Sequence, residues 1–296
     1  MELNQLRSFL MVVEAGNFTR AAVRLDISQP SLSQQIINLE KELGHKLFHR
    51  LGRKAVPTEA GAVFVERARR ILVEVESATK ELADHPSLER RITVGAIPTV
   101  APYLLPSLIT RCKKRFPNLQ VHIREDFTSA LIRYVSDGEL DLAIASLPRN
   151  EPMLSVESLL VEPLLLVVAK THPLAAKGKV SGEDLATETF AMLGGSSSLA
   201  AQIQSFCGVH NFQPRIGFRC AQVVTVKALV GIGAAVSILP RVARAPWDAE
   251  TLVYLDIQGA SPTRELGVFR HLQRYQSRGS EQFLTVLREV SRELVA

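Results

Sequence analysis

The stretch from residue 28 to residue 43, SQPSLSQQIINLEKEL, alternates apolar and polar side chains at helical spacing. Its apolar stripe comprises Leu32, Ile36, Leu39 and Leu43, which follow one another at intervals of four, three and four residues. At about 100° per residue these side chains share one face of a helix, whereas serine, glutamine and asparagine occupy the other face. The pattern predicts a short helix that packs along one face and presents hydrogen-bonding groups on the other.

A second, shorter helix is predicted immediately before this one. Residues 3–13 form a first apolar-periodic helix, which Gly16 can end, and Asn17 can cap the next helix through its side-chain oxygen. Residues 26–27 leave room only for a tight turn before Ser28, which is a good N-cap for the polar-faced helix. Two helices joined in this way form a helix-turn-helix, whose second helix places its N-terminal side chains against base edges in the major groove.

The polar face of the second helix suits the recognition of DNA bases. Glutamine can pair with adenine through two hydrogen bonds, and serine can donate to or accept from several base edges. The alternative is a helical hairpin within a larger core, with the polar face simply solvated. The residues of these two helices that we expect at the DNA are Thr19, Ser28, Gln29, Pro30, Ser31, Ser33 and Gln34.

A basic wing is predicted to follow the two helices. Residues 46–48 and 54–57 can form two short strands that turn at Leu51 and Gly52. Residues 1–58 contain eight Lys and Arg against five Asp and Glu, so this segment is net basic. Basic side chains beside a recognition helix suit phosphate contacts, which hold a protein on DNA without reading its sequence. The wing residues expected to make these contacts are Arg50, Arg53 and Lys54.

Residues 59–88 are predicted to form a long helix and a linker. Apolar residues in the helix recur with a period of about 3.5, which is typical of a coiled-coil seam. The predicted seam comprises Phe64, Ala68, Ile71, Val75, Ala78 and Leu82. The alternative is a helix packed on its own domain, but the narrow stripe among charged residues favours a partner helix. A dimer built on this helix would present two recognition helices to a dyad-symmetric DNA site.

From residue 91 onward, short apolar runs alternate with helical patterns. RITVGA, LQVHIRE and LDLAIAS are predicted strands with helices between them, an arrangement that implies a parallel sheet covered by helices. A second series of strands is predicted at LLLVVAK, TFAML, RIGFRC and AAVSILP, followed by a strand at ELGVFR and a helix over residues 280–294. Two similar α/β lobes suggest a clamshell with a ligand between them, at the carboxyl ends of the strands.

The segment AGNFTRAAVRLDISQPSLSQQIINLEKELGHKLFHR, followed by PTEAG, resembles the LysR-type transcriptional regulators, and the resemblance extends over the full chain. One departure is Ile37, where relatives often carry a basic residue; an apolar side chain there can touch a thymine methyl instead. The resemblance implies a periplasmic-binding-protein-like effector domain whose chain crosses twice between the lobes. It also implies that paired effector domains assemble a homodimer into a homotetramer, and RNA polymerase is a further candidate partner of such a regulator.

We therefore expect an α/β protein in three parts. These are a winged helix-turn-helix domain at 1–58, a dimerisation helix and linker at 59–88, and an effector-binding domain at 89–296. Within the effector domain, the first lobe is expected to comprise residues 91–161 and 269–296, and the second lobe residues 162–268.

Hydroxyl side chains follow several predicted strands at the positions where helices begin. Hydroxyls and free N–H groups at several helix N-termini can bind an anion without cations, so our hypothesis for the effector is a small carboxylate or similar anion. The alternative is that these Ser and Thr residues are ordinary N-caps. The family resemblance places the positions of Thr99 and Thr128 in the effector cleft. The residues expected to line the ligand are Pro98, Thr99, Val100, Thr128, Ser129, Ser146, Ser196, Ser197, Ser198 and Arg270.

The regulatory half is most similar to the peroxide-sensing OxyR branch of the family, through GAIPTVAPYLLP, SFC, GIGAAVSILP and GVFR. This resemblance matches Cys207 to the resolving cysteine, Ser198 to the peroxidatic position and Arg270 to a cleft-adjacent arginine. Serine cannot form a thiolate or a sulfenic acid, so the disulfide switch is expected to be absent. Cys207 lies on the apolar side of its helix, which favours a small core residue. Arg270 can serve an anion or pair with a carboxylate.

Composition and motifs set limits on other classes of function. The net charge of +5 permits an anionic partner but does not demand one. Three cysteines without paired spacing argue against a disulfide framework or a zinc site. We find no glycine-rich phosphate loop, nucleophile elbow or metal-spaced histidine cluster, so we expect neither an enzyme nor a bound cofactor or metal. No secretory signal or bilayer-spanning apolar run is evident, so we expect a cytoplasmic protein with no membrane partner.

Two alternatives to an effector-responsive regulator stay open. A solute-binding protein for transport would share the two-lobed fold, but the N-terminal helix-turn-helix and the lack of a signal peptide count against it. A redox-responsive transcription regulator would need a cysteine pairing other than the family's, because Ser198 replaces the reactive cysteine.

Overall fold

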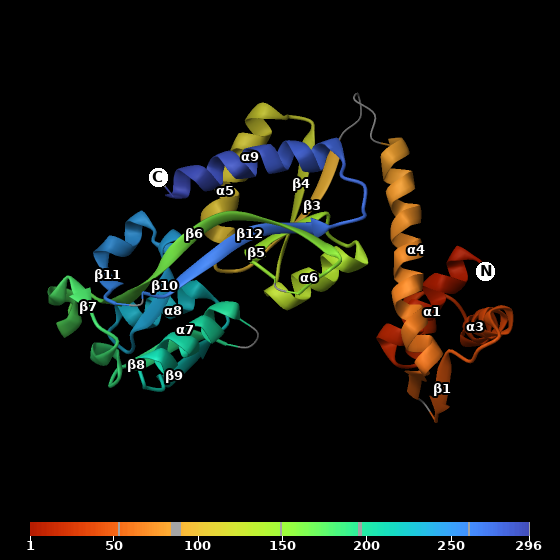
Figure 1. The fold of residues 1–296 in the computed structure, drawn as a ribbon, viewed down its shortest axis with the longest axis horizontal. Helices are drawn as coiled ribbons and strands as arrows, with labels where there is room; N and C mark the ends of the chain where they lie inside the picture. The colour runs from red at the N-terminus through yellow and green to blue at the C-terminus, as the bar shows by residue number, and fades with distance from the viewer. Residues whose placement is uncertain (53, 84–89, 149, 195–196, 260, 296) are drawn as a thin grey trace. The chain divides into compact units, whose positions relative to one another are not determined.

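The computed structural model describes residues 1–296 except 53, 84–89, 149, 195–196, 260 and 296. The chain divides into two compact units, Met1–Ala83 and Asp84–Ala296, which we describe separately (Figure 1). No helix among the described residues is long and apolar enough to cross a membrane.

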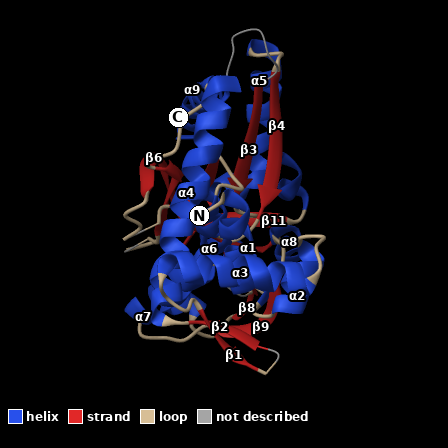
Figure 2. Cartoon of the chain, turned by 90° about the vertical axis from the view of Figure 1, so that its right-hand side faces the viewer, coloured by secondary structure: helices blue, strands red, loops and turns tan. Residues whose placement is uncertain are grey.

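The first unit is a winged helix-turn-helix with a long helix after it. Its elements are α1 (Leu3–Ala15), α2 (Phe18–Arg24), α3 (Gln29–Leu43), β1 (Phe48–Leu51), β2 (Lys54–Pro57) and α4 (Glu59–Ala83). Strands β1 and β2 pair in antiparallel fashion to form the wing (Figure 2). The turn between them contains Gly52 at a φ of 60°, a left-handed conformation that favours glycine. The predicted helix-turn-helix and wing are confirmed.

The first strand of the wing begins later than predicted. Residues 46–48 were expected to form it, but β1 starts at Phe48 because the carboxylate of Glu40 on α3 holds the preceding segment. Glu40 is buried and accepts a hydrogen bond from the backbone N–H of Leu47 at 2.8 Å and one from Lys46 Nζ at 2.8 Å. These contacts direct the chain out of α3 and into the wing.

The apolar stripe of α3 forms the centre of the core in this unit. Leu32, Ile36 and Leu39 are fully buried and pack with Phe9 of α1. Asn17 caps α2 as predicted, accepting hydrogen bonds from two backbone N–H groups of its first turn. Burial of one face of α3 leaves its other face free for a ligand.

The predicted dimer seam of α4 divides into two halves. Ala68 is fully buried in the core of its own unit, and the ring centroid of Phe64 lies 5.1 Å from that of Phe9. Ile71 also packs on this core, but it is only half-buried, as is Phe64. The prediction was wrong for Ala68, because residues of the same unit, including α1, cover it; for the rest of the stripe the dimer seam stays a prediction. Ala78 and Leu82 are exposed, and Leu82 keeps 88% of its surface accessible.

The second unit has two lobes, and strands of both lobes belong to one mixed sheet of eight described strands. Strands β3 (Arg90–Ala96), β4 (Leu119–Glu125) and β5 (Leu142–Ser146) are parallel, as the βαβαβ pattern predicts. The strand order of the largest sheet is β4-β3-β5-β12-β6-β11-β7, and β10 also pairs with β6. The remaining strands are β6 (Leu154–Ala169), β7 (Lys179–Val180), β8 (Thr189–Leu193), β9 (Arg215–Cys220), β10 (Ser237–Pro240), β11 (Leu252–Ile257) and β12 (Thr263–His271).

Helices cover these strands and complete two separate cores. The helices are α5 (Ala101–Arg115), α6 (Thr128–Asp137), α7 (Ser198–Val209), α8 (Val223–Gly231) and α9 (Arg278–Val295), with short 3-10 turns η1 (Pro173–Lys177), η2 (Glu183–Leu185), η3 (Arg241–Ala243) and η4 (Pro246–Glu250). The first lobe's core includes residues of α5, α6 and α9, and the second lobe's core includes residues of α7 and α8.

Strands β6 and β12 run antiparallel and side by side from one lobe toward the other (Figure 1). β6 is 16 residues long because its first half pairs with β12 and its second half with β10 and β11. The sequence pattern predicted only the second half of β6 and did not predict β11. The second crossing also comes earlier than the predicted boundary at 268/269, because Leu266 and Val268 already lie in the first lobe's core.

The burial of Ala68 in its own unit leads to a prediction about the stability of that unit. Ala68→Leu should overpack the core and lower the free energy of unfolding by about 1–3 kcal/mol. The matched change Ala62→Leu, at an exposed position of the same helix outside the predicted seam, should alter it by less than about 0.5 kcal/mol. Calorimetry of the full chain can follow the melting of the N-terminal unit. Equal effects of the two substitutions would contradict the packing of α4 on its own unit.

Candidate functional site

The polar face of α3 is exposed at its N-terminal end. Gln29, Pro30, Ser31 and Gln34 are exposed, as is Thr19 on α2, whereas Ser33 is half-buried. Ser28 caps α3, because its Oγ accepts a hydrogen bond from the backbone N–H of Ser31 at 3.2 Å. Ser28 is therefore engaged in holding the helix, and the exposed amides are the groups available to a ligand.

The two glutamine side chains of α3 lie along the helix surface. Gln29 Nε2 donates to Ser33 Oγ at 3.0 Å, and Gln34 Nε2 donates to Asn38 Oδ1 at 2.9 Å. Each amide keeps its own carbonyl oxygen and one N–H free of these contacts. An amide that retains both a donor and an acceptor can form the paired hydrogen bonds that adenine requires.

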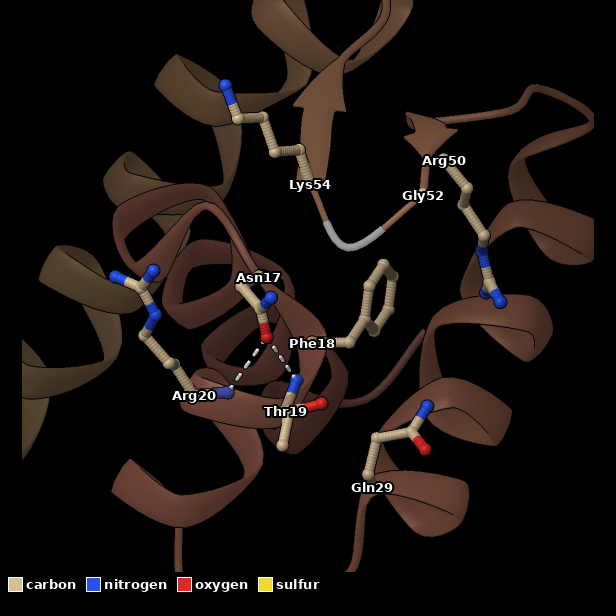
Figure 3. A pocket seen from close by; sticks show the side chains of 8 residues that line it. All are labelled: Asn17, Phe18, Thr19, Arg20, Gln29, Arg50, Gly52 and Lys54. Carbon is tan, nitrogen blue, oxygen red and sulfur yellow. Dashed lines mark hydrogen bonds between the residues drawn. The ribbon is translucent and has the colours of Figure 1, made fainter.

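A cationic pocket lies between α2, the start of α3 and the wing (Figure 3). This head pocket has a volume of about 630 Å³, and its lining residues are Asn17, Phe18, Thr19, Arg20, Gln29, Arg50, Gly52 and Lys54. Three of these residues are cationic and none is acidic. In Figure 3, Arg20 and Lys54 lie to the left of the Phe18 ring, Arg50 lies to its right and Gln29 lies below it.

Local contacts position the side chains of the head pocket. Asn17 Oδ1 accepts hydrogen bonds from the backbone N–H groups of Thr19 at 2.8 Å and Arg20 at 3.1 Å (Figure 3). The guanidinium carbon of Arg50 lies 4.6 Å from the centroid of the Phe18 ring, within the range of a cation–π contact. Cations and helix N-termini around one pocket suit a phosphate backbone, and the adjacent amides suit base edges.

Part of this pocket was predicted from the sequence. The predicted residues that line it are Thr19, Gln29, Arg50 and Lys54, whereas Phe18 and Arg20 were not predicted. Arg20 follows Thr19 in the first turn of α2, so adjacency to a capping Asn was a signal that could have identified it. Arg53, which was also predicted, lies outside the described residues. Pro30, Ser31 and Gln34 are exposed beyond the pocket, on the face of α3.

A second, much smaller cavity lies in the effector domain where several strands end. This inner cavity has a volume of about 10 Å³, roughly the room that one water molecule requires. Its lining residues are Ile97, Pro98, Thr99, Phe127, Thr128, Leu193, Ser197 and Ser198. They follow β3, β4 and β8, so the cavity lies at the carboxyl ends of strands from both lobes, as predicted for the ligand site.

The hydroxyl groups around the inner cavity are not ordinary helix caps. α5, α6 and α7 have no side-chain hydrogen bond at their N-cap residues. Ser198 Oγ instead lies 3.0 Å from Ser146 Oγ at the end of β5, a contact that joins the two lobes. Hydroxyl groups that do not cap their helices can hydrogen-bond a ligand, and the N–H groups of the first turns favour an anion.

The side chain of Thr99 is hydrogen-bonded to a buried arginine. Arg264 on β12 donates from Nη1 to Thr99 Oγ1 at 2.7 Å, and Nε donates to Glu162 Oε1 on β6 at 2.8 Å. Arg264 is only 1% exposed, and this burial lowers its pKa while the Glu162 carboxylate opposes the effect. Because the Thr99 oxygen accepts from Arg264, its own proton is available to an acceptor in the cavity.

Four predicted effector residues need separate comment. Val100 is buried in the first lobe's core, and Ser129 is exposed and does not line the inner cavity. Ser196 lies outside the described residues. Arg270 was expected beside the cleft, but it pairs with Glu281 at 2.9 Å and lies opposite Leu142, at the start of β5. Because Ser146 ends that strand, Arg270 lies at the opposite end of β5 from Ser146, and Arg264 is the arginine that contacts the cavity lining, through Thr99.

The roles of Arg264 and Glu162 were not predicted from the sequence, because both residues lie just before the predicted strands ELGVFR and LLLVVAK. They face each other across β6 and β12, 102 residues apart in the chain. No spacing rule could name a partner this far along the chain. Only the strand register identifies the pair.

The cysteines and the potential metal ligands give no further site among the described residues. Cys112, Cys207 and Cys220 are free and buried. Burial raises the pKa of both Cys112 and Cys207 to about 11, which keeps them protonated near neutral pH. No group of three or more His, Cys, Asp or Glu within the described part of the chain could hold a metal ion.

Comparison with known proteins identifies both units. Residues 3–62 match the model of bacterial regulatory helix-turn-helix proteins of the lysR family, and residues 85–292 match the LysR substrate-binding domain. The chain is 34% identical over 271 residues to the DNA-binding transcriptional dual regulator OxyR of Escherichia coli K12, covering 90% of this chain and 88% of that protein.

Solved structures agree with these matches. Full-length OxyR of Pseudomonas aeruginosa superposes with a TM-score of 0.72 at 28% identity, covering 97% of this chain and 98% of that one. Full-length CbnR in complex with its target DNA superposes with a TM-score of 0.63 at 25% identity, covering 98% of this chain and all (100%) of that one. The chain therefore belongs to the LysR family of transcriptional regulators, with a helix-turn-helix that binds DNA and a C-terminal domain that binds an effector.

Proposed function

We propose that this chain is a sequence-specific regulator that binds a dyad-symmetric DNA site and answers to a small anionic effector at the inner cavity. The observation that carries the DNA part is the cationic head pocket beside the exposed amides of Gln29 and Gln34. Its cations engage phosphates and its amides engage bases. The protein acts in the cytoplasm, where DNA is accessible, and has no catalytic step.

Assembly into a homodimer or homotetramer is supported by two exposed apolar surfaces. The C-terminal half of α4 exposes Ala78 and Leu82. The outer face of α8 exposes Val224 at 65% and Ile232 at 78%, with Ala228 between them. Apolar side chains grouped on a surface favour a protein contact, and two such surfaces on different elements allow a dimer to pair again.

Effector binding is proposed to act by opening the lobes. The inner cavity holds about one water, so an anion larger than water requires Ser146 and Ser198 to separate. β6 and β12 connect the lobes and form the hinge for this movement. A ligand that binds the open form better shifts the population toward it, and the altered subunit packing changes the spacing of the DNA-binding units.

A redox-responsive regulator is the second candidate, favoured by the similarity to OxyR. Peroxide-dependent disulfide formation needs an accessible thiolate. In this chain Ser198 lines the inner cavity, and the three cysteines are buried. These observations support the effector mechanism over the redox mechanism.

Base recognition is tested by comparing Gln34→Ala with Lys54→Ala. Loss of the Gln34 amide should weaken binding to the cognate site by about 1–3 kcal/mol and leave binding to random DNA nearly unchanged. Loss of the Lys54 charge should weaken binding to both the cognate site and random DNA. It should also reduce the magnitude of the slope of log K against log salt concentration by about 0.9. Fluorescence anisotropy at several salt concentrations measures both effects. Equal losses on cognate and random DNA for Gln34→Ala would rule out its role in readout.

The effector site is tested by Thr128→Val, with Ser129→Ala as the control. Thr128 lines the inner cavity and Ser129, its neighbour, does not, so only the first change should reduce the thermal shift produced by small anions. DNA affinity without effector should stay the same for both variants. Thr99→Val is a poorer choice because it would leave the buried Arg264 guanidinium without its hydroxyl partner. An unchanged shift in Thr128→Val would remove Thr128 from the site.

The redox alternative is tested by the pH dependence of thiol alkylation. Because burial raises the pKa of Cys112 and Cys207 to about 11, their thiolate fraction at pH 7 is on the order of 10⁻⁴. Alkylation of these two thiols in the folded protein should therefore be slow at neutral pH and accelerate only as the pH approaches 11. Mass spectrometry should find three free thiols before and after peroxide, with the unfolded chain as a positive control. A peroxide-induced loss of accessible thiols would restore the redox mechanism.

A further inference from the structure

One side chain of α5 extends from the first lobe to the second. Leu104 and Leu105 lie in the core of the first lobe, whereas Tyr103, in the first turn of the same helix, packs against the core of the second. Tyr103 follows Thr99, in the lining of the inner cavity, by four residues. It therefore crosses between the lobes at the end of α5 that is nearest to the inner cavity.

In the second lobe Tyr103 meets a buried lysine of α8. Lys227 is 9% exposed, and its Nζ donates to the carbonyl oxygen of Ala243 and, at 2.6 Å, to Asp248 Oδ2. Asp248 also accepts a hydrogen bond from the hydroxyl of Tyr254 at 2.6 Å. These contacts all lie within the second lobe, and they fix the ammonium group while satisfying two of its three N–H donors.

The ammonium group of Lys227 lies over the ring of Tyr103. Nζ is 5.1 Å from the ring centroid, within the range of a cation–π contact. Burial, together with the charge of Asp248, raises the pKa of Tyr103 to about 12, so the ring is a neutral phenol at physiological pH. A cation–π contact is stronger where water is excluded, and Lys227 is almost fully buried.

Separation of the lobes breaks this contact. Because α5 belongs to the first lobe and α8 to the second, Tyr103 and Lys227 move apart when the lobes open. Lys227 cannot follow the ring, since Ala243 and Asp248 hold its ammonium group. The ring also leaves the apolar surface of the second lobe and enters water. Both changes disfavour the open form.

We propose that Tyr103 and Lys227 form a latch that holds the two lobes closed and sets how often they open without a ligand. The latch rests on the lobe opening proposed above, but not on the identity of the effector. A ligand that binds the open form must overcome the latch, so its apparent affinity falls with the fraction of molecules that are open. The strength of this one contact thus sets how much effector the protein needs.

The substitution Ser146→Cys provides a probe of opening in the full-length protein. Ser146 is 8% exposed, and its Oγ lies 3.0 Å from Ser198 Oγ of the other lobe. An alkylating reagent reaches the new thiol when the lobes separate, so the labelling rate follows the open fraction. Peptide mapping by mass spectrometry distinguishes this thiol from the three native cysteines. No effector is added, so the result does not depend on which anion binds.

Two substitutions of Tyr103 in the Ser146→Cys protein separate the aromatic ring from its apolar bulk. Tyr103→Leu should raise the labelling rate about 5- to 30-fold, which corresponds to the roughly 1–2 kcal/mol of a partly desolvated cation–π contact. Tyr103→Phe is the matched control; it keeps the ring and should change the rate by less than about twofold. Labelling of Cys207, in the core of the second lobe, should be the same in all three proteins.

Three results would overturn the latch. They are equal labelling rates with Tyr103 and with Tyr103→Leu, equal increases for Tyr103→Leu and Tyr103→Phe, and a matching increase at Cys207. The last would mean that Tyr103 stabilises the second lobe itself and not the closed arrangement. If the Ser146→Cys thiol is labelled only in the unfolded chain, whatever residue is at position 103, the lobes do not open. That outcome would reject the opening mechanism, whereas equal measurable rates would reject the latch alone.

Discussion

The buried ion pair between Glu162 and Arg264 is the interaction on which the effector domain depends. Burying two charges costs several kcal/mol per ion unless each is paired and hydrogen-bonded, and removing one partner of such a pair typically costs about 3–5 kcal/mol. Here the pair satisfies this requirement by recruiting Thr99 and the backbone of Val242. The same contacts that compensate the buried charges therefore position the lining of the inner cavity and the turn η3, at the point where β6 and β12 pass between the lobes.

The DNA-binding unit follows a simpler principle, since apolar burial on one side determines exposure on the other. Leu32, Ile36 and Leu39 remove one face of α3 from water, and this leaves the amides of Gln29 and Gln34 outside. The first turn of α2, capped by Asn17, places Arg20 in the lining of the same pocket as the wing cation Arg50, on the opposite side of Phe18 (Figure 3). Recognition of DNA is thus a consequence of how the core is packed, with few interactions devoted to the site itself.

Predictions from the sequence succeeded where structure is local. The stripe of α3, the cap at Asn17 and the βαβαβ order depend on residues close together in the chain, and the structure agrees with all of them. The predictions failed where the partner is distant. Ala68 packs on its own unit because α1 lies beside α4, and the double length of β6 depends on pairing with three later strands. Arg270 and Arg264 lie on the same strand, and only their neighbours across the sheet separate their roles.

The sequence by itself determined the class of protein, the helix-turn-helix with its exposed glutamines, and the hydroxyl groups at the ends of the strands. These features follow from periodicity and capping, which act over a few residues. Tertiary structure decided which arginine supports the inner cavity, how far the apolar stripe of α4 is left for a partner, and that Glu162 is linked to the inner cavity through Arg264 and Thr99. Each of these depends on contacts between residues far apart in the chain, whose energy arises only when folding removes them from water together.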